Sequence, residues 1–265
     1  MSLLDRILGP EGISPRFRPI VNLSTPDQTA RALDVVGQGP AGTTLEDPTV
    51  LSEYARRKLA EPMVDRAVAA AAIRATNCLV DPLELHLPVH ASTLSRDWSF
   101  AESLADLCAE ADLERGRVVV VASFLGGPVE PESLQAGVRR LRRRSFLVAL
   151  PVDRDSSTFY QVLLTRPDLL RIEPLFLRGV DEDPVPRSVL QSICTLGRSL
   201  GAGIVAAGIE TKEQTEILRE ATGVSRAFGP RFSGPRPLSE LVDEGWISAS
   251  RAEGRLELLP TGNSG

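Results

Sequence analysis

Short apolar, β-branched runs alternate with segments of helical pattern along almost the whole chain. The runs are nearly continuous in apolar residues, which is typical of strands buried on both faces. Apolar positions at helical spacing fill most of the intervals between them. The predicted strands lie at residues 17–23, 31–36, 83–89, 117–123, 145–152, 168–174, 203–209 and 226–230.

The segments between these strands carry helix start and stop signals. "PESLQAGVRRLRRR" has acid early and base late, which matches the helix dipole. "RSVLQSICTLGRSLGA" ends near Gly201, a residue type that commonly follows a helix. "TKEQTEILREATG" starts at Thr211 with Gln214 three residues later, the pattern of a capping box. This alternation predicts parallel strands covered by helices.

About eight strand–helix units in 265 residues favour a closed barrel over an open sheet. The first two strands are separated only by "STPDQTA", which is too short for a helical crossover, so they should pair as an antiparallel hairpin. The predicted fold class is therefore α/β, a modified (β/α)8 TIM-like barrel with one antiparallel strand. In such barrels the chemistry sits at the C-terminal ends of the strands.

The pattern also divides the chain into three predicted parts. Residues 1–13 form an N-terminal helix or extension, which we expect to cap the open end of the barrel. Residues 14–246 form the barrel domain. Residues 247–265 show no clear periodicity and are predicted to be a C-terminal tail.

The charge and composition of the chain argue against several classes of function. The net charge of −5, with both signs interspersed, argues against a general nucleic-acid binder or a membrane-surface protein. The apolar stretches are too short to span a bilayer, and the N-terminus lacks the pattern of a signal peptide, so we expect a cytoplasmic protein. Cys78, Cys108 and Cys194 are few and far apart, which indicates neither a disulfide framework nor a zinc site.

Four segments, in order and spacing, resemble an EAL domain, the cyclic di-GMP phosphodiesterase family. They are "FRPIVNLSTPDQTARALD", "LLRIEPLFLRGV", "LGRSLGAGIVAAGIETKEQTEILREATG" and "FGPRFSGPRPLSEL". The resemblance runs over residues 14–246 and is most specific at Gly208–Thr211, which is similar to the end of the family's A-E-G-V-E-T motif. It implies a modified barrel with one antiparallel strand. In family enzymes it also implies two divalent cations, held at the strand ends by carboxylates and one asparagine.

Most of the metal-ligand positions implied by the resemblance carry other residues here. The glutamate of the E-A-L motif falls on Arg31, a cation that would repel Mg²⁺ or Mn²⁺. Asp153 and Asp155 lie near the family's paired aspartates but out of register. The remaining ligand positions fall on Pro88 or His90 (depending on a short gap), Ser123, Pro151, Val152 and Ala207.

Two charged positions of the motifs persist. The family's lysine is replaced by Arg171, which keeps the charge but not the variable pKa of a lysine. Glu210 is the one family acid still in place. The arginine that contacts phosphate in the family falls on Val35, and the closing glutamine falls near Phe228, so cyclic di-GMP binding is not expected.

The resemblance therefore implies a catalytically inactive domain without metal or cofactor. We expect it to act in bacterial signalling through an unidentified protein partner or through self-association. Two alternatives stay open. One is a metal-independent receptor for cyclic di-GMP or another nucleotide, with Arg31, Arg171 and Glu210 as ligand-binding residues. The other is an enzyme with a new activity at the barrel mouth that uses Glu210, Asp153 or the histidines.

Other chemical signals in the sequence are weaker. His86 and His90 flank a strand end two positions apart, but two histidines without a third ligand are poor support for a metal site. The basic run at residues 139–144 is typical of a solvated helix end. Ser123 follows a strand, but "VASFLG" is not a nucleophile elbow, so the sequence predicts no Ser-His-Asp site.

Overall fold

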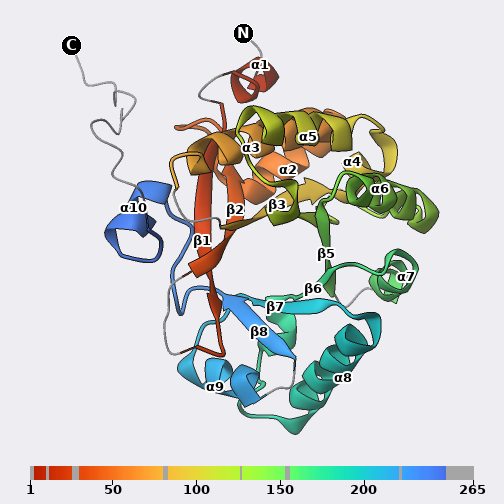
Figure 1. Cartoon of the computed structure of the whole chain (residues 1–265), viewed down its shortest axis with the longest axis vertical. Coiled ribbons are helices and arrows are strands. Elements are labelled where there is room, and N and C mark those ends of the chain that lie inside the picture. The colour runs from red at the N-terminus through yellow and green to blue at the C-terminus, as the bar shows by residue number, and fades with distance from the viewer. Residues whose placement is uncertain are drawn as a thin grey trace.

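A computed structural model describes residues 3–9, 12–25, 30–79, 83–125, 127–152, 156–220 and 223–248. Within them, eight strands close into a barrel in chain order, as Figure 1 shows. Each strand coincides with one of the runs predicted from the sequence. The strands are β1 (Ser14–Asn22), β2 (Ala30–Gln38), β3 (Glu84–His90), β4 (Val118–Ser123), β5 (Leu147–Val152), β6 (Leu169–Ile172), β7 (Gly203–Ala207) and β8 (Val224–Phe228).

Strand β1 is the single antiparallel strand of the barrel. It runs antiparallel to both β2 and β8, whereas β2 to β8 pair with one another in parallel. The register places Ser14 opposite Gln38 and Arg18 opposite Asp34. The predicted barrel with one antiparallel strand is therefore confirmed. The C-terminal ends of β2 to β8 define one open end, which we call the mouth.

Helices surround the ring of strands (Figure 1). The capping box predicted at the start of α9 is present: the Gln214 N–H donates to Thr211 Oγ1 at 3.1 Å, and the Thr211 N–H donates to Gln214 Oε1 at 3.3 Å. Gly201 ends α8 in the left-handed conformation, as expected of a C-cap glycine. The α-helices are α1 (Leu3–Ile7), α2 (Pro48–Arg57), α3 (Glu61–Thr76), α4 (Ala91–Arg96), α5 (Phe100–Glu110), α6 (Pro131–Arg143), α7 (Ser156–Thr165), α8 (Pro184–Leu200), α9 (Lys212–Glu220) and α10 (Leu238–Asp243). The 3₁₀-helices are η1 (Thr44–Glu46), η2 (Arg115–Arg117) and η3 (Pro174–Leu177).

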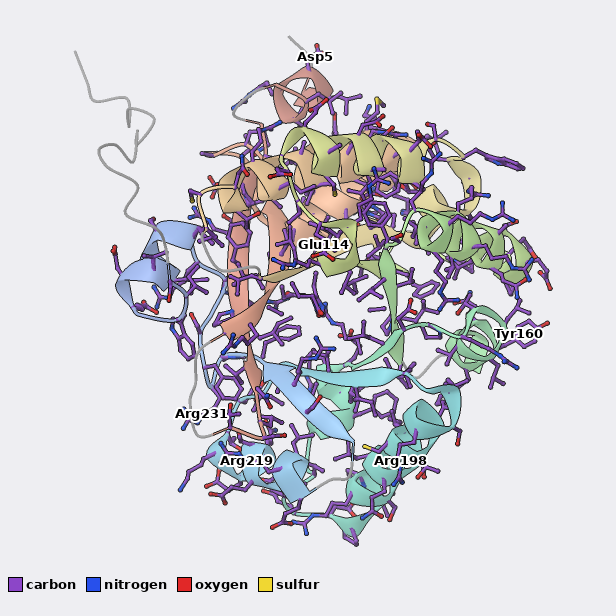
Figure 2. The ribbon with its side chains drawn as sticks, in the orientation of Figure 1. Asp5, Glu114, Tyr160, Arg198, Arg219 and Arg231 are labelled. Carbon is purple, nitrogen blue, oxygen red and sulfur yellow. The ribbon has the colours of Figure 1, made fainter. Side chains whose placement is uncertain are left out.

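Alternation of side chains along each strand creates two apolar layers. One lies between the strands and the helices, and it includes Ile7 of α1. The other fills the barrel interior, where Figure 2 shows side chains converging from around the ring. The interior is therefore a packed core and not a pore. Its apolar members are Ile20, Ala32, Val119, Val121, Ala149, Leu169, Val205, Ala207 and Phe228.

Both ends of the described chain pack against the barrel. Ile7 is fully buried, so the N-terminal helix packs against the barrel domain. Ile247, assigned to the tail from its sequence, is only 6% exposed and packs in the outer layer. The predicted tail from residue 249 onward lies outside the described residues. The described helices include none long and apolar enough to cross a lipid bilayer.

Candidate functional site at the barrel mouth

A cavity of about 550 Å³ opens at the mouth. This volume lies within the range of small-molecule sites in proteins, and the position is the one at which barrels of this class carry their chemistry. Apolar side chains of β2, α2 and α3 form much of its wall. Its polar and charged lining consists of Arg18, Ser52, Asp65, His90, Ser123, Arg171 and Glu173.

A chain of ion pairs lies at the inner end of the mouth. Asp34 of β2 is only 1% exposed. It accepts hydrogen bonds from Arg18 Nε at 2.9 Å and from Arg171 Nη1 at 2.8 Å. Arg171 Nε in turn lies 3.0 Å from Glu173 Oε1. Both guanidinium groups stack on the ring of Phe228, 4.7 and 4.8 Å from its centroid.

This inner cluster is electrically balanced. Burial works to raise the pKa of Asp34, but the charges of Arg171 and Arg18 hold that pKa below its ordinary value. Burial likewise works to lower the pKa of Arg171, and the charges of Asp34 and Glu173 raise it above its ordinary value. The Asp34 carboxylate and the Arg171 guanidinium are therefore both ionised at neutral pH, and Asp34 is committed to two cations.

Within the described residues, the strands β4, β5 and β7 end at the mouth on residues without a carboxylate. Ser123 ends β4 and Pro151 lies near the end of β5, and both line the cavity. Ala207 is buried in the barrel interior, and Val152 packs in the outer layer. Among the described residues, no group of three or more His, Cys, Asp and Glu side chains is placed to hold a metal ion. Asp153 and Asp155 lie outside the described residues.

Arg31 does not join Arg171 at the mouth. It is exposed near the N-terminal end of β2, far along the strand from the mouth. It also lies on the strand face opposite Ala32 and Asp34, which point into the barrel. The alternative in which Arg31 and Arg171 bind one nucleotide together at the mouth is therefore wrong for Arg31. Sequence reasoning missed Asp34, although an acid inside an apolar strand was a usable signal.

The motif around Gly208 serves local structure. Gly208 adopts a φ of +75°, and a Cβ there would lie 2.4 Å from Pro174 Cγ, so only glycine fits. Gln214 accepts from the Glu210 N–H at 2.8 Å and donates from Nε2 to the Leu177 carbonyl at 3.2 Å. The Glu210 residue is exposed. The motif therefore fixes the loop after β7 against η3, which gives a physical reason for its persistence.

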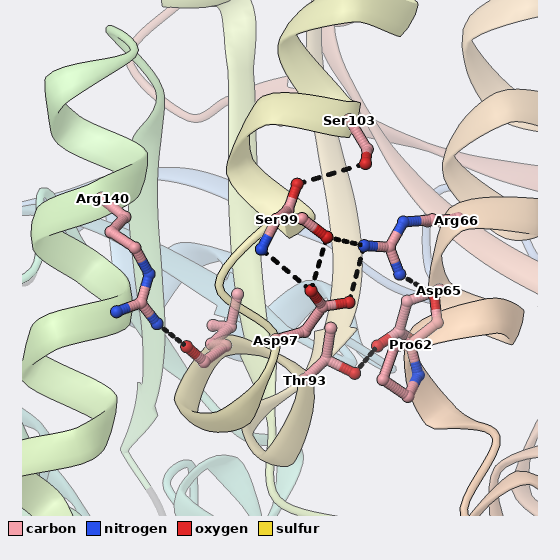
Figure 3. A network of polar contacts seen from close by, with 9 residues as sticks. Pro62, Asp65, Arg66, Thr93, Asp97, Ser99, Ser103 and Arg140 are labelled. Carbon is pink, nitrogen blue, oxygen red and sulfur yellow. Dashed lines mark hydrogen bonds and ion pairs between the residues drawn. The ribbon is translucent and has the colours of Figure 1, made fainter.

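A second polar cluster lies on the cavity wall and joins α2, α3 and β3. Ser52 Oγ is 2.5 Å from His90 Nε2, and His90 Nδ1 is 2.7 Å from Asp65 Oδ1. The other Asp65 oxygen accepts from the His90 N–H at 3.1 Å and from Thr93 Oγ1 at 2.5 Å. Figure 3 shows Thr93 of α4 and Asp65 of α3 in this contact. The order hydroxyl, imidazole, carboxylate is that of a Ser-His-Asp triad.

The serine of this cluster is Ser52, which no motif in the sequence marks, and Ser123 is not part of it. Ser52 sits in the middle of α2 on the same buried face as Leu51 and Ala55. Asp65 likewise interrupts the apolar face of α3. Ser52 and Asp65 could have been recognised from the sequence as single polar residues on the buried faces of two successive helices. Only the fold brings them to His90.

The electrostatics of His90 are set by this cluster. Burial works to lower its pKa, but the hydrogen bond and charge of Asp65, together with the charge of Glu61, raise the pKa above its ordinary value. His86 belongs to a different cluster. Its Nε2 lies 2.6 Å from Glu84 Oε1, which also accepts from Arg226 Nη1 at 2.5 Å. The two histidines therefore have separate partners.

The basic run at the end of α6 is engaged in packing. Arg140 donates to the Leu94 carbonyl at 2.9 Å, as Figure 3 shows, and stacks on Trp98 at 5.0 Å. Arg142 donates to the Thr165 carbonyl at 3.0 Å. These contacts join α6 to its neighbouring helices. Arg140 and Arg142 therefore have a structural role, whereas the sequence predicted a solvated helix end.

The fold and the cavity at its mouth define a barrel of the EAL type, and the family comparison agrees. The family model of the EAL domain matches residues 3–235. The chain therefore belongs to the EAL domain family.

Curated relatives match parts of the chain. The "Probable cyclic di-GMP phosphodiesterase PdeD" of Escherichia coli K12 is 32% identical over 114 residues, which cover 43% of this chain and 21% of that protein. The "Cyclic di-GMP phosphodiesterase PA2567" of Pseudomonas aeruginosa is 28% identical over 170 residues, which cover 63% of this chain and 28% of that protein. The match thus spans only a minor part of each relative.

Solved structures share the fold at low sequence identity. An EAL domain protein from Listeria monocytogenes aligns with a TM-score of 0.79 at 18% identity, over 92% of this chain and 98% of that one. The EAL domain of FimX from Pseudomonas aeruginosa, solved bound to cyclic di-GMP, aligns with a TM-score of 0.77 at 15% identity. That alignment covers 89% of this chain and 95% of the other.

Proposed function

We propose that this EAL domain does not hydrolyse cyclic di-GMP and acts as a protein-interaction and regulatory module in bacterial signalling. The observation that carries the proposal is the state of Asp34, the acid at the inner end of the mouth. Its two oxygens are bound by Arg18 and Arg171. A divalent cation placed there would have to displace two guanidinium groups that are hydrogen-bonded to the carboxylate.

The remaining donors do not fit a pair of Mg²⁺ or Mn²⁺ ions. Such ions require several convergent oxygen ligands, mostly carboxylates and carbonyls. The strand ends offer Pro151, Val152 and Ala207 instead, and Glu173 is paired with Arg171. Within the described part of the chain, the site therefore offers too few ligands for a metal-activated water.

An exposed apolar face on α7 and α8 supports the interaction role. Phe159, Tyr160 and Leu163 of α7 are 40%, 53% and 55% exposed. Val185 and Val189 of α8 add to this face, and a groove of about 320 Å³ runs between Phe159 and the α8 side chains. Figure 2 shows Tyr160 pointing away from the barrel. Contiguous apolar surface of this kind is typical of protein contacts.

A second candidate function is a metal-independent receptor for an anionic nucleotide. The observation that favours it is that Arg18 and Arg171 both line the cavity. Guanidinium groups bind phosphate well, although here each is already paired with a carboxylate. A ligand would have to compete with Asp34 and Glu173.

Two assays test these proposals. The first incubates the purified chain with cyclic di-GMP and Mg²⁺ or Mn²⁺. We expect no linear product, and turnover would overturn the proposal. The second is calorimetric titration with cyclic di-GMP, with and without Mg²⁺. Saturable heat that is lost in Arg171→Ala would establish the receptor function, and absence of heat would exclude it.

The interaction role has its own test. We expect a molar mass that rises with concentration in light scattering, and loss of this rise in Tyr160→Glu. The matched control is Trp98→Glu, which removes another exposed aromatic side chain, 78% exposed and outside this face. A monomer at all concentrations would exclude self-association, and binding to a separate partner would then have to depend on the same α7 and α8 residues.

A further inference from the structure

The Ser52–His90–Asp65 cluster has the connectivity of a nucleophilic site. Asp65 Oδ1 faces His90 Nδ1, and Asp65 Oδ2 is already bound by the His90 N–H and by Thr93. A carboxylate only accepts hydrogen bonds, so the neutral imidazole must carry its proton on Nδ1. The lone pair of Nε2 then points at Ser52 Oγ, 2.5 Å away, and Ser52 must donate its proton to it.

The cluster is buried but open to the cavity. Ser52, His90 and Asp65 are 8%, 7% and 3% exposed, and all three line the cavity at the mouth. A buried imidazole–carboxylate pair is strengthened by the low dielectric around it, while contact with the cavity lets a bound molecule reach the hydroxyl. A purely structural link among α2, α3 and β3 would not need to face a cavity large enough for a small molecule.

We propose that Ser52 is a nucleophile activated by His90, with Asp65 as the positioning residue, and that the cavity accepts carboxylic esters with a short apolar acyl group. The acyl specificity follows from the aliphatic wall next to the cluster, formed by Leu51, Val64 and Val68. This activity is separate from the proposed regulatory role.

The proposed reaction needs no reagent other than the ester and water. Ser52 Oγ bonds to the carbonyl carbon of the ester, and its proton passes to His90 Nε2. The bond between the carbonyl carbon and the alkoxy oxygen breaks, and the alcohol leaves with that proton. Water then attacks the acyl-serine and gives a proton to His90, which returns it to Ser52 as the acid is released.

The first test is covalent labelling of the full chain with a fluorophosphonate probe, in which serine oxygen displaces fluoride from phosphorus. We expect one label per chain, mapped to Ser52 by peptide mass spectrometry, and none in Ser52→Ala. The matched control is Ser92→Ala, because Ser92 is also 8% exposed and is bound to Glu61 instead of a histidine. No label on the wild-type chain, or a label at another residue, would overturn the proposal.

The second test is hydrolysis of p-nitrophenyl acetate and butyrate. We expect Ser52→Ala and His90→Gln to lose about 10²-fold or more in rate, with unchanged circular dichroism. Equal rates in wild type and Ser52→Ala would contradict the proposal. Asp65→Asn tests whether Asp65 positions His90 or only fills space. If it positions His90, the substitution should lower kcat and leave KM nearly unchanged. It should also move the ascending limb of the pH–rate profile to lower pH, since Glu61 would then be the only acid that raises the His90 pKa.

Discussion

Asp34 and Arg171 are 137 positions apart in the chain and form a 2.8 Å ion pair across the barrel interior. With Arg18 on the other side of Asp34, this pair holds β1, β2 and β6 together at the inner end of the mouth. Arg18 and Arg171 together bind both oxygens of the Asp34 carboxylate, so these oxygens are not free to bind a metal ion. The same interaction therefore bears on stability and on the proposed loss of phosphodiesterase activity.

Removal of Asp34 should destabilise the barrel strongly. In Asp34→Ala, both guanidinium groups lose the Asp34 carboxylate, although Arg171 keeps its ion pair with Glu173. Leaving a fully buried charge uncompensated costs about 3–5 kcal/mol, and because both guanidinium groups are partly exposed we expect about 2–3 kcal/mol here. Urea unfolding followed by circular dichroism should show this loss of free energy. The control is Glu53→Ala, which removes two exposed ion pairs on α2 and should hardly change the midpoint.

The same carboxylate should make the fold acid-sensitive. The folded-state pKa of Asp34 lies below its ordinary value of 3.8, so the unfolded chain takes up the proton at a higher pH than the folded chain. Its contribution to stability is therefore present above about pH 4 and lost as pH falls through the folded pKa. The difference in urea midpoint between wild type and Asp34→Asn should shrink as pH falls from 6 to below 4. A constant difference would contradict this assignment.

His90 should have the opposite dependence. Its folded pKa is raised above 6.5, so its contribution to stability is fully present below the unfolded pKa and is lost as pH rises through the folded pKa. The charged groups that raise it are Asp65 and Glu61, both on α3. NMR titration of the imidazole should give a midpoint above 6.5 in wild type and a lower midpoint in Asp65→Asn.

A comparison of Gly208→Ala with Gly201→Ala should separate the cost of backbone strain from the cost of a steric clash. The substitution places a Cβ 2.4 Å from Pro174 Cγ and also forces a non-glycine residue to a φ of +75°. Gly201 has nearly the same φ, +70°, but no atom within 4 Å of the added Cβ. We expect Gly201→Ala to cost about 1 kcal/mol and Gly208→Ala clearly more, in thermal or urea unfolding. If the two variants lose equal free energy of unfolding, η3 must move to make room for the added methyl group.

Much of the fold follows from local sequence patterns. The eight strands, the hairpin imposed by the short "STPDQTA" connection and the Thr211–Gln214 capping box depend on residues close together in the chain. Periodicity, loop length and capping chemistry are local properties, so the sequence alone was enough to predict them. The family motifs, which extend along most of the chain, pointed to the same barrel.

The site could be predicted only in part, because its residues meet through barrel closure. A motif alignment placed Arg31 at the mouth, but the period of two along a strand and the register with β1 put Asp34 inside and Arg31 outside. Ser52 and His90 are 38 positions apart, and Asp65 and His90 are 25 apart. Their contact depends on how α2 and α3 pack beside the end of β3. The sequence determined which elements form, and the tertiary structure decided which side chains meet, since strand register and helix packing are fixed by contacts between distant parts of the chain.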